Sequence, residues 1–560
     1  MAKKKQPDLY LGLDVGGTHT DAVLVGGKGL AAHYKAVTDH DNLLRSVRRA
    51  IEEITAGVDR SDIRRINLST TLSTNAIVEN HLEDVCVIIS SGPGIDPENF
   101  SIGRHFHAVG GSIDHRGTEV EPPDPKELAR IAGDMAEKKV RTFAAVTKFS
   151  TRNPDHEHLI RDAVRSASDF TTQGHALSGT LGFPRRIVTA YFNSAVWRIY
   201  NRFADAIRDG LAELGIGAEI NILKADGGTM PFSLSRNIPV ESILSGPAAS
   251  IMGIAALCDI TRDSIVLDIG GTTTDIAIFA GGAPLIEKDG ISLQTHPTLV
   301  RALKTRSIGV GGDSAINIDN KNVTVGPVRT GPAMAAGGNV PTLVDALNFR
   351  KDIAFGDTAA SERGIAALAP AHGLSPLELA DGAVNFASRR IKAEVDDMLE
   401  GIRNRPVYTI HEMLEGVTIA PVKLYVMGGP AEGMRKALAG VFGLDVIVPQ
   451  HYDVANAIGA ALARTTVDIE LFADTGKGTL LIPGIDVREK VPPGYTLEQA
   501  ERDVKRYLAA RLGGFGIEVD DGDTEIIESS SFSMVDGYYS TGRDIRVKCQ
   551  IKPGVIRRLA

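Results

Sequence analysis

Asp14-Val-Gly-Gly-Thr-His-Thr-Asp-Ala22 recurs later in the chain as Asp268-Ile-Gly-Gly-Thr-Thr-Thr-Asp-Ile276, with six of the nine positions identical. Each copy lies between apolar runs rich in β-branched residues, which predicts a β-hairpin whose turn is Gly-Gly-Thr. Glycines at such a turn let backbone N–H groups approach an anion closely. Two hairpins of this kind predict two phosphate-binding loops that face each other across a nucleoside triphosphate site.

The aspartate that leads each hairpin, Asp14 or Asp268, is the first candidate for catalysis and for holding a hydrated divalent cation, Mg²⁺ or Mn²⁺. The alternative is a turn residue bonded to its own backbone, and its occurrence in both hairpins favours the cation. Asp21 and Asp275 fit turn capping equally well. For the threonines the alternative is simple β-propensity. The predicted phosphate contacts are Gly16, Gly17, Thr18 and Thr20 in the first hairpin and Gly270, Gly271, Thr272 and Thr273 in the second.

Two further glycine turns follow in order along the chain. Ile308-Gly-Val-Gly-Gly-Asp-Ser314 contains Gly311, Gly312 and Asp313, and Leu424-Tyr-Val-Met-Gly-Gly-Pro430 places Gly428 and Gly429 after an apolar strand. One such turn is weak evidence, whereas the ordered set is specific. The set resembles the actin, sugar kinase and Hsp70 superfamily of ATPases. That resemblance implies an α/β fold with two RNase H-like (actin-like ATPase) domains around a nucleotide cleft, and an adenosine-binding turn at Gly428 and Gly429.

Within that superfamily the chain resembles the hydantoinase A/oxoprolinase family of ATP-dependent amide-ring-opening enzymes and their carboxylase relatives. The resemblance implies phosphoryl transfer from Mg·ATP to an amide or carbonyl oxygen of a small substrate, such as a cyclic amide, to drive ring opening or carboxylation. It implies Thr71, Asn75, Arg104 and His175 as substrate-binding residues, and a hydantoinase B-like partner subunit, a homo-oligomer, or both. The matching stretches cover most of the chain: 14–21, 69–77, 150–157, 225–229, 244–249, 268–277 and 307–314.

Three departures from the family pattern leave the substrate open. His19 stands where the family usually has Phe, the stretch from Arg104 to Arg116 differs, and Gly331 to Gly338 lacks the expected cysteine. His105 and His107 have a spacing that puts both rings on one face of a strand, and His115 follows nearby. No third metal ligand is fixed by the sequence, so a hydrogen-bonded loop is favoured over a metal site. For Arg104 the alternative is a surface salt bridge, and for Thr71 and Asn75 it is ordinary turn chemistry.

Composition narrows the function classes. The 560 residues exceed what one core usually supports and indicate several structural units. A net charge of −9 argues against nucleic acid or an anionic membrane as the main partner. The three cysteines are far apart in the sequence, no apolar run has membrane-spanning length, and the basic N-terminal tail has no apolar segment. We therefore expect a cytoplasmic protein.

The pattern of elements predicts four regions: an N-terminal ATPase domain (8–190) with an inserted loop region, connecting helices and a strand (191–263), a second ATPase domain (264–465), and a small α+β C-terminal domain (466–560). Helices are predicted over 42–55, 125–139, 193–214, 245–257, 382–402, 432–441 and 497–512. Strands are predicted over 85–90, 142–146, 220–224 and 424–427 and within 525–551. The small residues from Val454 to Ala461 predict a helix that packs closely on the one near 247–256.

Two other functions remain open at this stage. A small-metabolite kinase of the same superfamily needs an aspartate base, which the sequence does not identify. An ATP-driven activator or chaperone-like ATPase would produce a conformational output, and cluster-binding activators need cysteines that lie closer together. The absence of a GxxxxGK[ST] sequence excludes a P-loop NTPase.

Overall fold

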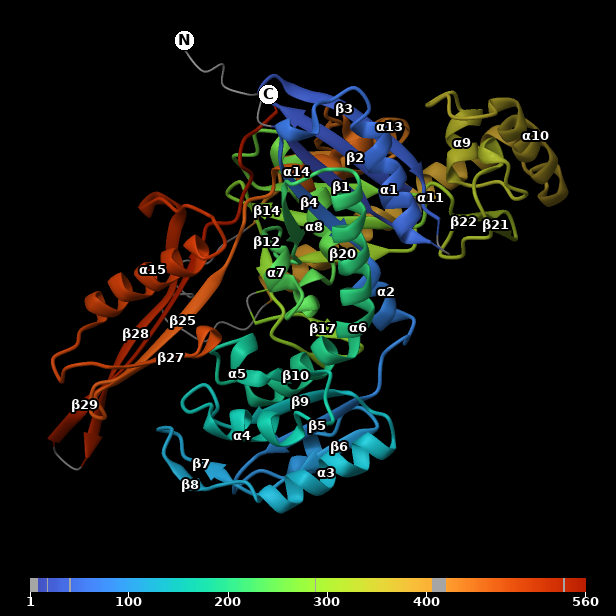
Figure 1. Cartoon of the computed structure of the whole chain (residues 1–560). Coiled ribbons are helices and arrows are strands. Elements are labelled where there is room, and N and C mark those ends of the chain that lie inside the picture. Colours follow the sequence, from blue (N-terminus) through green and yellow to red (C-terminus); the bar gives the residue numbers. More distant parts are fainter. Residues whose placement is uncertain are drawn as a thin grey trace, which may run out of the picture.

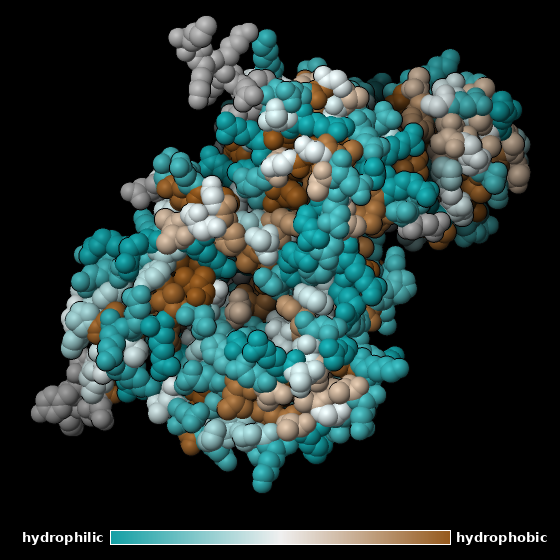
Figure 2. Space-filling view, viewed as in Figure 1, coloured by the Kyte–Doolittle hydropathy of each residue, from teal (hydrophilic) through white to brown (hydrophobic). Residues whose placement is uncertain are grey.

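The computed structural model describes residues 9–17, 19–39, 42–287, 289–404, 419–536 and 539–559. Two mixed sheets lie next to each other in the upper part of Figure 1, a third sheet with its helices lies below them, and a C-terminal domain projects to one side. Of the helices in these ranges, none combines the length and the apolar character needed to cross a bilayer. The face shown in Figure 2 is mostly hydrophilic, with apolar areas separated by polar ones.

The first sheet carries the first hairpin and has the strand order β12-β11-β4-β1-β2-β3. β1, β2 and β3 are antiparallel neighbours, whereas β4 and β11 run parallel to β1. Helix α1 packs on this hairpin side, and the long α6 packs on α1. The bounds are β1 (Leu9–Val15), β2 (His19–Gly26), β3 (Gly29–Val37), α1 (Leu43–Ile54), β4 (Ile63–Thr70), α2 (Leu72–Val78), α6 (Phe183–Glu213), β11 (Glu219–Leu223), β12 (Thr229–Pro231) and α7 (Phe232–Ser235).

The second sheet repeats this topology around the second hairpin. Its order is β15-β14-β13-β23-β24, with β20 also paired to β14. β13 and β14 are antiparallel, and β23 and β24 run parallel to β13. The duplicated order confirms the predicted pair of related α/β domains. The bounds are β13 (Ser264–Ile269), β14 (Thr274–Ala280), β15 (Ala283–Pro284), β20 (Thr305–Ile308), α9 (Leu343–Phe349), α10 (Thr358–Leu368), α11 (Pro376–Arg403), β23 (Lys423–Met427), α13 (Ala431–Phe442) and β24 (Asp445–Ile447).

An inserted unit between β4 and α6 contains a four-stranded parallel sheet, in the order β10-β9-β5-β6. Every residue of β5 and β9 is buried, as expected for a parallel sheet covered on both faces. The bounds are β5 (Val85–Ser90), β6 (His105–Ala108), β7 (Ser112–Ile113), β8 (Glu119–Glu121), α3 (Pro125–Glu137), β9 (Thr142–Thr147), α4 (Asp155–Val164), β10 (Phe170–Gln173) and α5 (Gly174–Leu177).

The C-terminal domain is an antiparallel five-stranded sheet with one helix, α15, against it, which confirms the expected α+β class. Ala500, Val504, Leu508 and Leu512 recur at helical spacing and form the buried face of α15. The bounds are β25 (Asp468–Asp474), β26 (Thr479–Ile482), β27 (Val487–Lys490), α15 (Leu497–Gly513), β28 (Thr524–Asp536) and β29 (Tyr539–Ile551).

The predicted helices and strands are present, but two helices begin earlier than predicted: α11 starts at Pro376 and not at Gly382, and α6 differs more. This helix begins at Phe183, well before the predicted start at Asn193. Its first turn contains Pro184, which suits the start of a helix, and much of the segment is buried, so its hydrophobic pattern has weak periodicity.

Two small-residue helices, α8 (Ser245–Leu257) and α14 (Ala455–Leu462), pack against each other between the two sheets. A Cβ on Gly253 would lie 2.0 Å from the carbonyl oxygen of Ala455, and one on Gly459 would lie 2.0 Å from that of Ala249. On its other side α14 contacts β1, where a Cβ on Gly12 would lie 2.1 Å from the Ala457 oxygen. The expected close helix pair is therefore confirmed, and it requires glycine at these positions.

Gly253→Ala should destabilise the protein by about 1–3 kcal/mol, because the new methyl group meets backbone that has no room to move. Gly210→Ala is the matched control, since its Cβ would meet nothing within 4 Å and alanine favours the helix by about 1 kcal/mol. Thermal unfolding followed by circular dichroism should show a lower Tm for the first variant and an equal or higher Tm for the second. Equal Tm values in both would contradict the close packing.

Candidate functional site

The first hairpin brings two buried carboxylates to the end of β1. Asp14 pairs with Asp21 across the hairpin, and the two are 5% and 2% exposed. The Asn456 side-chain amide, from α14, donates to Asp14 Oδ2 at 2.5 Å and to Asp21 Oδ2 at 3.1 Å. Lys35 on β3 donates to Asp21 at 2.8 Å. Asp14 Oδ1 is buried and has no hydrogen-bond partner in the part of the chain that the structure describes.

The second hairpin repeats the arrangement with Asp268 opposite Asp275. Here α8 supplies the partner, because the Ser250 hydroxyl donates to Asp268 Oδ2 at 2.5 Å. The leading aspartate of each hairpin therefore receives a hydrogen bond from one of the two central helices, Asp14 from α14 and Asp268 from α8. The two hairpins are held in equivalent positions relative to α8 and α14.

The carboxylates of both hairpins influence one another. Burial raises the pKa of Asp14 to about 7, the charges of Asp21 and Asp268 add to this, and the polar contacts of Ser69 and Asn456 oppose it. Burial, followed by the charge of Asp268, raises the pKa of Asp275 to about 7, and burial also raises that of Asp268. Burial and mutual repulsion therefore disfavour the charged forms of Asp14 and Asp275.

These residues fit a hydrated Mg²⁺ or Mn²⁺ ion. The donor set is carboxylate oxygen, which hard divalent cations prefer, and Asp14 Oδ1 is a buried acceptor with no partner among the described residues. A cation between the hairpins would offset the repulsion among the carboxylates that raises their pKa values.

The glycine turns leave backbone accessible where phosphates are expected. Gly16 N–H donates to His19 O at 3.0 Å and Gly270 N–H to Thr273 O at 2.9 Å, so both turns close in the same way. A Cβ on Gly17 would meet nothing within 4 Å, and Thr272 and Thr273 are partly exposed. Thr20 is fully buried and its hydroxyl lies 3.0 Å from that of Thr38, which donates to Gly16 O. Thr18 lies outside the described residues.

The other two glycine turns lie directly against the second hairpin. Gly312 N–H donates to Gly270 O at 2.8 Å and Asp313 N–H to Gly271 O at 2.6 Å. The Asp313 carboxylate accepts from Arg329 and from Ala333 N–H, which belongs to the cysteine-free loop that departs from the family pattern. A Cβ on Gly428, which has φ +90°, would lie 2.7 Å from Asp268 Oδ1, whereas one on Gly429 would lie in open space. The structure brings Gly311, Gly312, Asp313, Gly428 and the hairpin together, and their contact with a nucleotide stays a prediction.

The four predicted substrate-side residues fall into two groups. Thr71 caps α2 and its N–H donates to Val15 O at 3.3 Å, which places it beside the first hairpin, with exposed Asn75 one turn further along the helix. Arg104 precedes β6 in the inserted unit, with its side chain 81% exposed and 3.7 Å from Asp84. His175 is buried in the same unit, 2.5 Å from Glu157. Of the four, only Thr71 bonds to a hairpin in the described contacts, and Asn75 is joined to it through Thr71.

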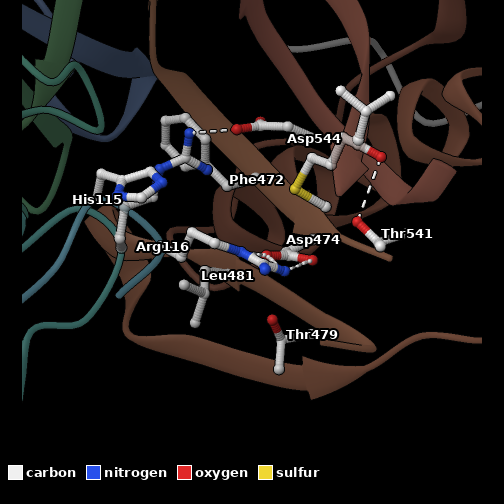
Figure 3. A pocket seen from close by; sticks show the side chains of 11 residues that line it. His115, Arg116, Phe472, Asp474, Thr479, Leu481, Thr541 and Asp544 are labelled. Atoms are coloured by element: carbon white, nitrogen blue, oxygen red, sulfur yellow. Dashed lines mark hydrogen bonds and ion pairs between the residues drawn. The ribbon is translucent and has the colours of Figure 1, made fainter. Parts of the chain in front are cut away.

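A cavity of about 450 Å³ lies between the inserted unit and the C-terminal domain (Figure 3). His115 and Arg116 reach it from the loop that departs from the family pattern, opposite side chains of β25, β26, β28 and β29. Arg116 pairs with Asp474 at 3.1 Å, and the buried Arg152 pairs with Asp544 at 2.8 Å with its guanidinium 4.6 Å from the Phe472 ring centre. The sequence indicated no chemistry for the C-terminal domain, so it did not predict that this domain lines a cavity.

A smaller cavity of about 80 Å³ lies where the inserted unit, the first α/β domain and the C-terminal domain meet. Glu470 lines it and is 9% exposed. Burial raises the pKa of Glu470 to about 7, although the charge of Lys548 opposes this. Among the described residues, His105, His107 and His115 belong to no group of three potential metal ligands.

Sequence reasoning also missed the partners of the hairpin aspartates, Asn456, Ser250 and Lys35. A signal for Asn456 was present, because it is the polar side chain within an otherwise small and apolar helix. Such a residue needs a buried partner. Lys35 and Ser250 carried no comparable signal.

Matches to family models, to individual proteins and to a solved structure agree with one another. The model of the Hydantoinase/oxoprolinase family matches residues 186–469, and that of the Hydantoinase/oxoprolinase N-terminal region matches 10–168. The chain is 24% identical to caprolactamase subunit alpha of Pseudomonas jessenii, over 96% of this chain and 77% of that protein. It is 23% identical to acetophenone carboxylase gamma subunit of Aromatoleum aromaticum, over 91% and 74%. The nucleotide-free structure of an ATP-dependent acetone carboxylase superposes with a TM-score of 0.71 at 16% identity, covering 99% of this chain and 89% of that one, which shows a shared fold.

Glu470 should make stability depend on pH. Because its pKa in the folded protein lies above its usual 4.5, its stabilising contribution is complete below pH 4.5 and is lost as the pH rises to about 7, by at most about 1.4 kcal/mol per pH unit. Tm measured across this range should fall less steeply for Glu470→Gln than for the unchanged protein. The exposed Glu53→Gln serves as control and should leave the slope unchanged, and a Glu470→Gln profile parallel to that control would contradict the assignment.

Proposed function

The chain belongs to the hydantoinase/oxoprolinase family, and we propose that it is the ATP-dependent component of an enzyme that phosphorylates the amide or carbonyl oxygen of a small substrate. One observation carries the proposal. Two Asp-X-Gly-Gly-Thr hairpins lie at the ends of equivalent strands in duplicated sheets, and Asp14 and Asp268 at their bases are close enough for the charge of Asp268 to raise the pKa of Asp14. This is the arrangement that a triphosphate and a divalent cation require.

In the proposed mechanism the hairpin turns bind phosphate oxygens through their backbone N–H groups, and the turn at Gly428 and Gly429 binds the adenosine. Mg·ATP, when bound, supplies the phosphoryl group and a cation that neutralises the developing charge. Asp14 and Asp268 would hold that cation, and Asn456 and Ser250 fix both carboxylates through the hydrogen bonds described above. The chemistry is mainly positioning and charge neutralisation.

The relatives suggest what the substrates have in common. The name caprolactamase refers to a lactam and acetophenone carboxylase to a ketone. Both compounds contain a carbonyl oxygen, which is a poor leaving group until it is phosphorylated. We propose a substrate of this class, with Thr71 on its side of the cleft because Thr71 bonds to the first hairpin, and with Asn75 beside it because its amide lies against the Thr71 hydroxyl.

Both relatives are named as subunits, so we propose that a hydantoinase B-like partner, with or without homo-oligomerisation, completes hydrolysis or carboxylation. The proposed phosphorylating chain would need to release or transfer its activated product to that partner. Closure of the two α/β domains over the substrate would limit loss of ATP to water.

Asp14→Asn and Asp268→Asn should each lower substrate-dependent phosphate release by about 100-fold or more, as for loss of a key electrostatic group. Burial already disfavours the charged form of Asp14, so the Asn variant should fold and the loss should reflect catalysis. Phosphate release is measured with hydantoins, 5-oxoproline, lactams, ketones and sugars, and Asp209→Asn, exposed on α6, is the control.

Release stimulated by a cyclic amide or ketone supports the proposal, whereas a stable phosphorylated alcohol would indicate a kinase. If both aspartate variants turn over ATP normally, the nucleotide site is wrongly placed.

Asn75→Ala should raise KM for the responsive substrate by about 5- to 10-fold, the cost of one hydrogen bond, and leave ATP affinity unchanged. Glu79→Ala, at the end of the same helix, is the matched control. Steady-state kinetics at saturating ATP distinguish the two variants, and an unaltered KM in Asn75→Ala removes this residue from the substrate site.

A further inference from the structure

A second group of potential metal ligands lies away from the hairpins, where the inserted unit meets the C-terminal domain. His158, His175 and Asp486 each place a ligand atom within 4.8 Å of the other two. They come from α4, from α5 and from the turn after Pro483–Ile485. Figure 1 shows α4 and α5 on the side of the inserted unit that faces β27, and α5 packs against the Pro483–Ile485 turn. The group is therefore assembled by tertiary contacts.

His175 is held as metal-binding histidines usually are. Its Nδ1 lies 2.5 Å from Glu157 Oε2, which also accepts from the His175 backbone N–H at 2.9 Å. Glu157 is itself fully buried and accepts from Thr147 N–H at 2.9 Å. A carboxylate fixed in this way orients the ring and leaves Nε2 free to bind an ion, as in carboxylate–histidine–metal triads.

The other two side chains lie near one another without a hydrogen bond. The His158 and His175 rings meet edge to face with centres 5.1 Å apart, and His158 Nε2 lies 3.7 Å from Asp486 Oδ1. That distance is too long for a hydrogen bond and suits two ligands of one ion. Asp486 has φ +54°, a conformation that aspartate and asparagine tolerate better than most residues, and the turn holds its carboxylate beside the histidines.

We propose that His158, His175 and Asp486 bind a divalent transition-metal ion of the Zn²⁺ type. Two imidazoles and one carboxylate favour such ions over Mg²⁺, which prefers oxygen ligands. With metal–ligand bonds of about 2.1 Å, tetrahedral ligands lie about 3.4 Å apart, so modest side-chain rotation closes the site. Three protein ligands leave a fourth position for water.

The ion would connect two domains beside the smaller cavity. Ala176 to Gly179, directly after His175, and Gly484, two residues before Asp486, line that cavity. Asp486 belongs to the C-terminal domain and both histidines belong to the inserted unit. The ion would therefore hold the two together and would leave its open position near the cavity. This site is separate from the proposed Mg·ATP site and does not depend on it.

The test is a Zn²⁺ titration of the full chain without nucleotide and with saturating Mg²⁺, followed by competition with a chromophoric chelator and by metal analysis after dialysis. We expect one Zn²⁺ per chain, and at least about 10-fold weaker binding in His158→Ala and in Asp486→Asn. Asparagine tolerates positive φ, so Asp486→Asn keeps the turn. Co²⁺ substitution should give the intense visible absorption of a four-coordinate ion in the unchanged protein but not in His158→Ala or Asp486→Asn.

His81→Ala and Asp155→Asn are the matched controls, since both side chains are largely exposed and outside the group. They should bind Zn²⁺ like the unchanged protein. Glu157→Gln should weaken binding by about 10- to 100-fold although all three ligands remain. The proposal is overturned if the unchanged protein binds no Zn²⁺, or if His158→Ala and Asp486→Asn bind it as the controls do.

Discussion

The contact between α8 and α14 is the constraint on which the proposed nucleotide cleft depends. Glycine at 253 and at 459 lets the helix backbones touch, and no side chain separates them. Helix α8 contains Ser250, which donates a hydrogen bond to Asp268, and α14 contains Asn456, which donates one to Asp14. The packing that fixes the spacing of the two sheets therefore also fixes the orientation of the two carboxylates. A change that separates the helices would disturb both hairpins at once.

The electrostatics of the cleft follow from this geometry. Four aspartates lie at the bases of the two hairpins, and Lys35 is the basic side chain that bonds to one of them, Asp21. Burial and mutual repulsion raise the pKa values of Asp14 and Asp275 to about 7. Without a cation the buried carboxylates repel one another, and a bound cation would offset this repulsion. Phosphate binding is therefore expected to be coupled to cation binding. In the proposed site, backbone N–H groups would then suffice for the phosphates, so a net charge of −9 does not oppose nucleotide binding.

The sequence predicted the parts of this site that are local. A hairpin turn and the aspartate before it are encoded within nine residues, and their repetition predicted two related domains. Contacts between distant residues were not accessible in the same way. Asn456 and Asp14 are 442 positions apart, and the cavity in Figure 3 joins the 115–116 loop to strands from the C-terminal domain. Turn glycines have a sequence signature, whereas a carboxylate that meets an arginine across a domain boundary has none.

Helix α6 connects the inserted unit to the first α/β domain. It runs from Phe183 to Glu213 and packs on β9 and β10 of the inserted unit as well as on α1 of the first α/β domain. Many of its side chains are buried, so it moves with both units and not between them. The inserted unit in turn pairs with the C-terminal domain through Arg116–Asp474 and Arg152–Asp544. Closure of the cleft would therefore move the second α/β domain against a larger body, in which the inserted unit and the C-terminal domain accompany the first hairpin.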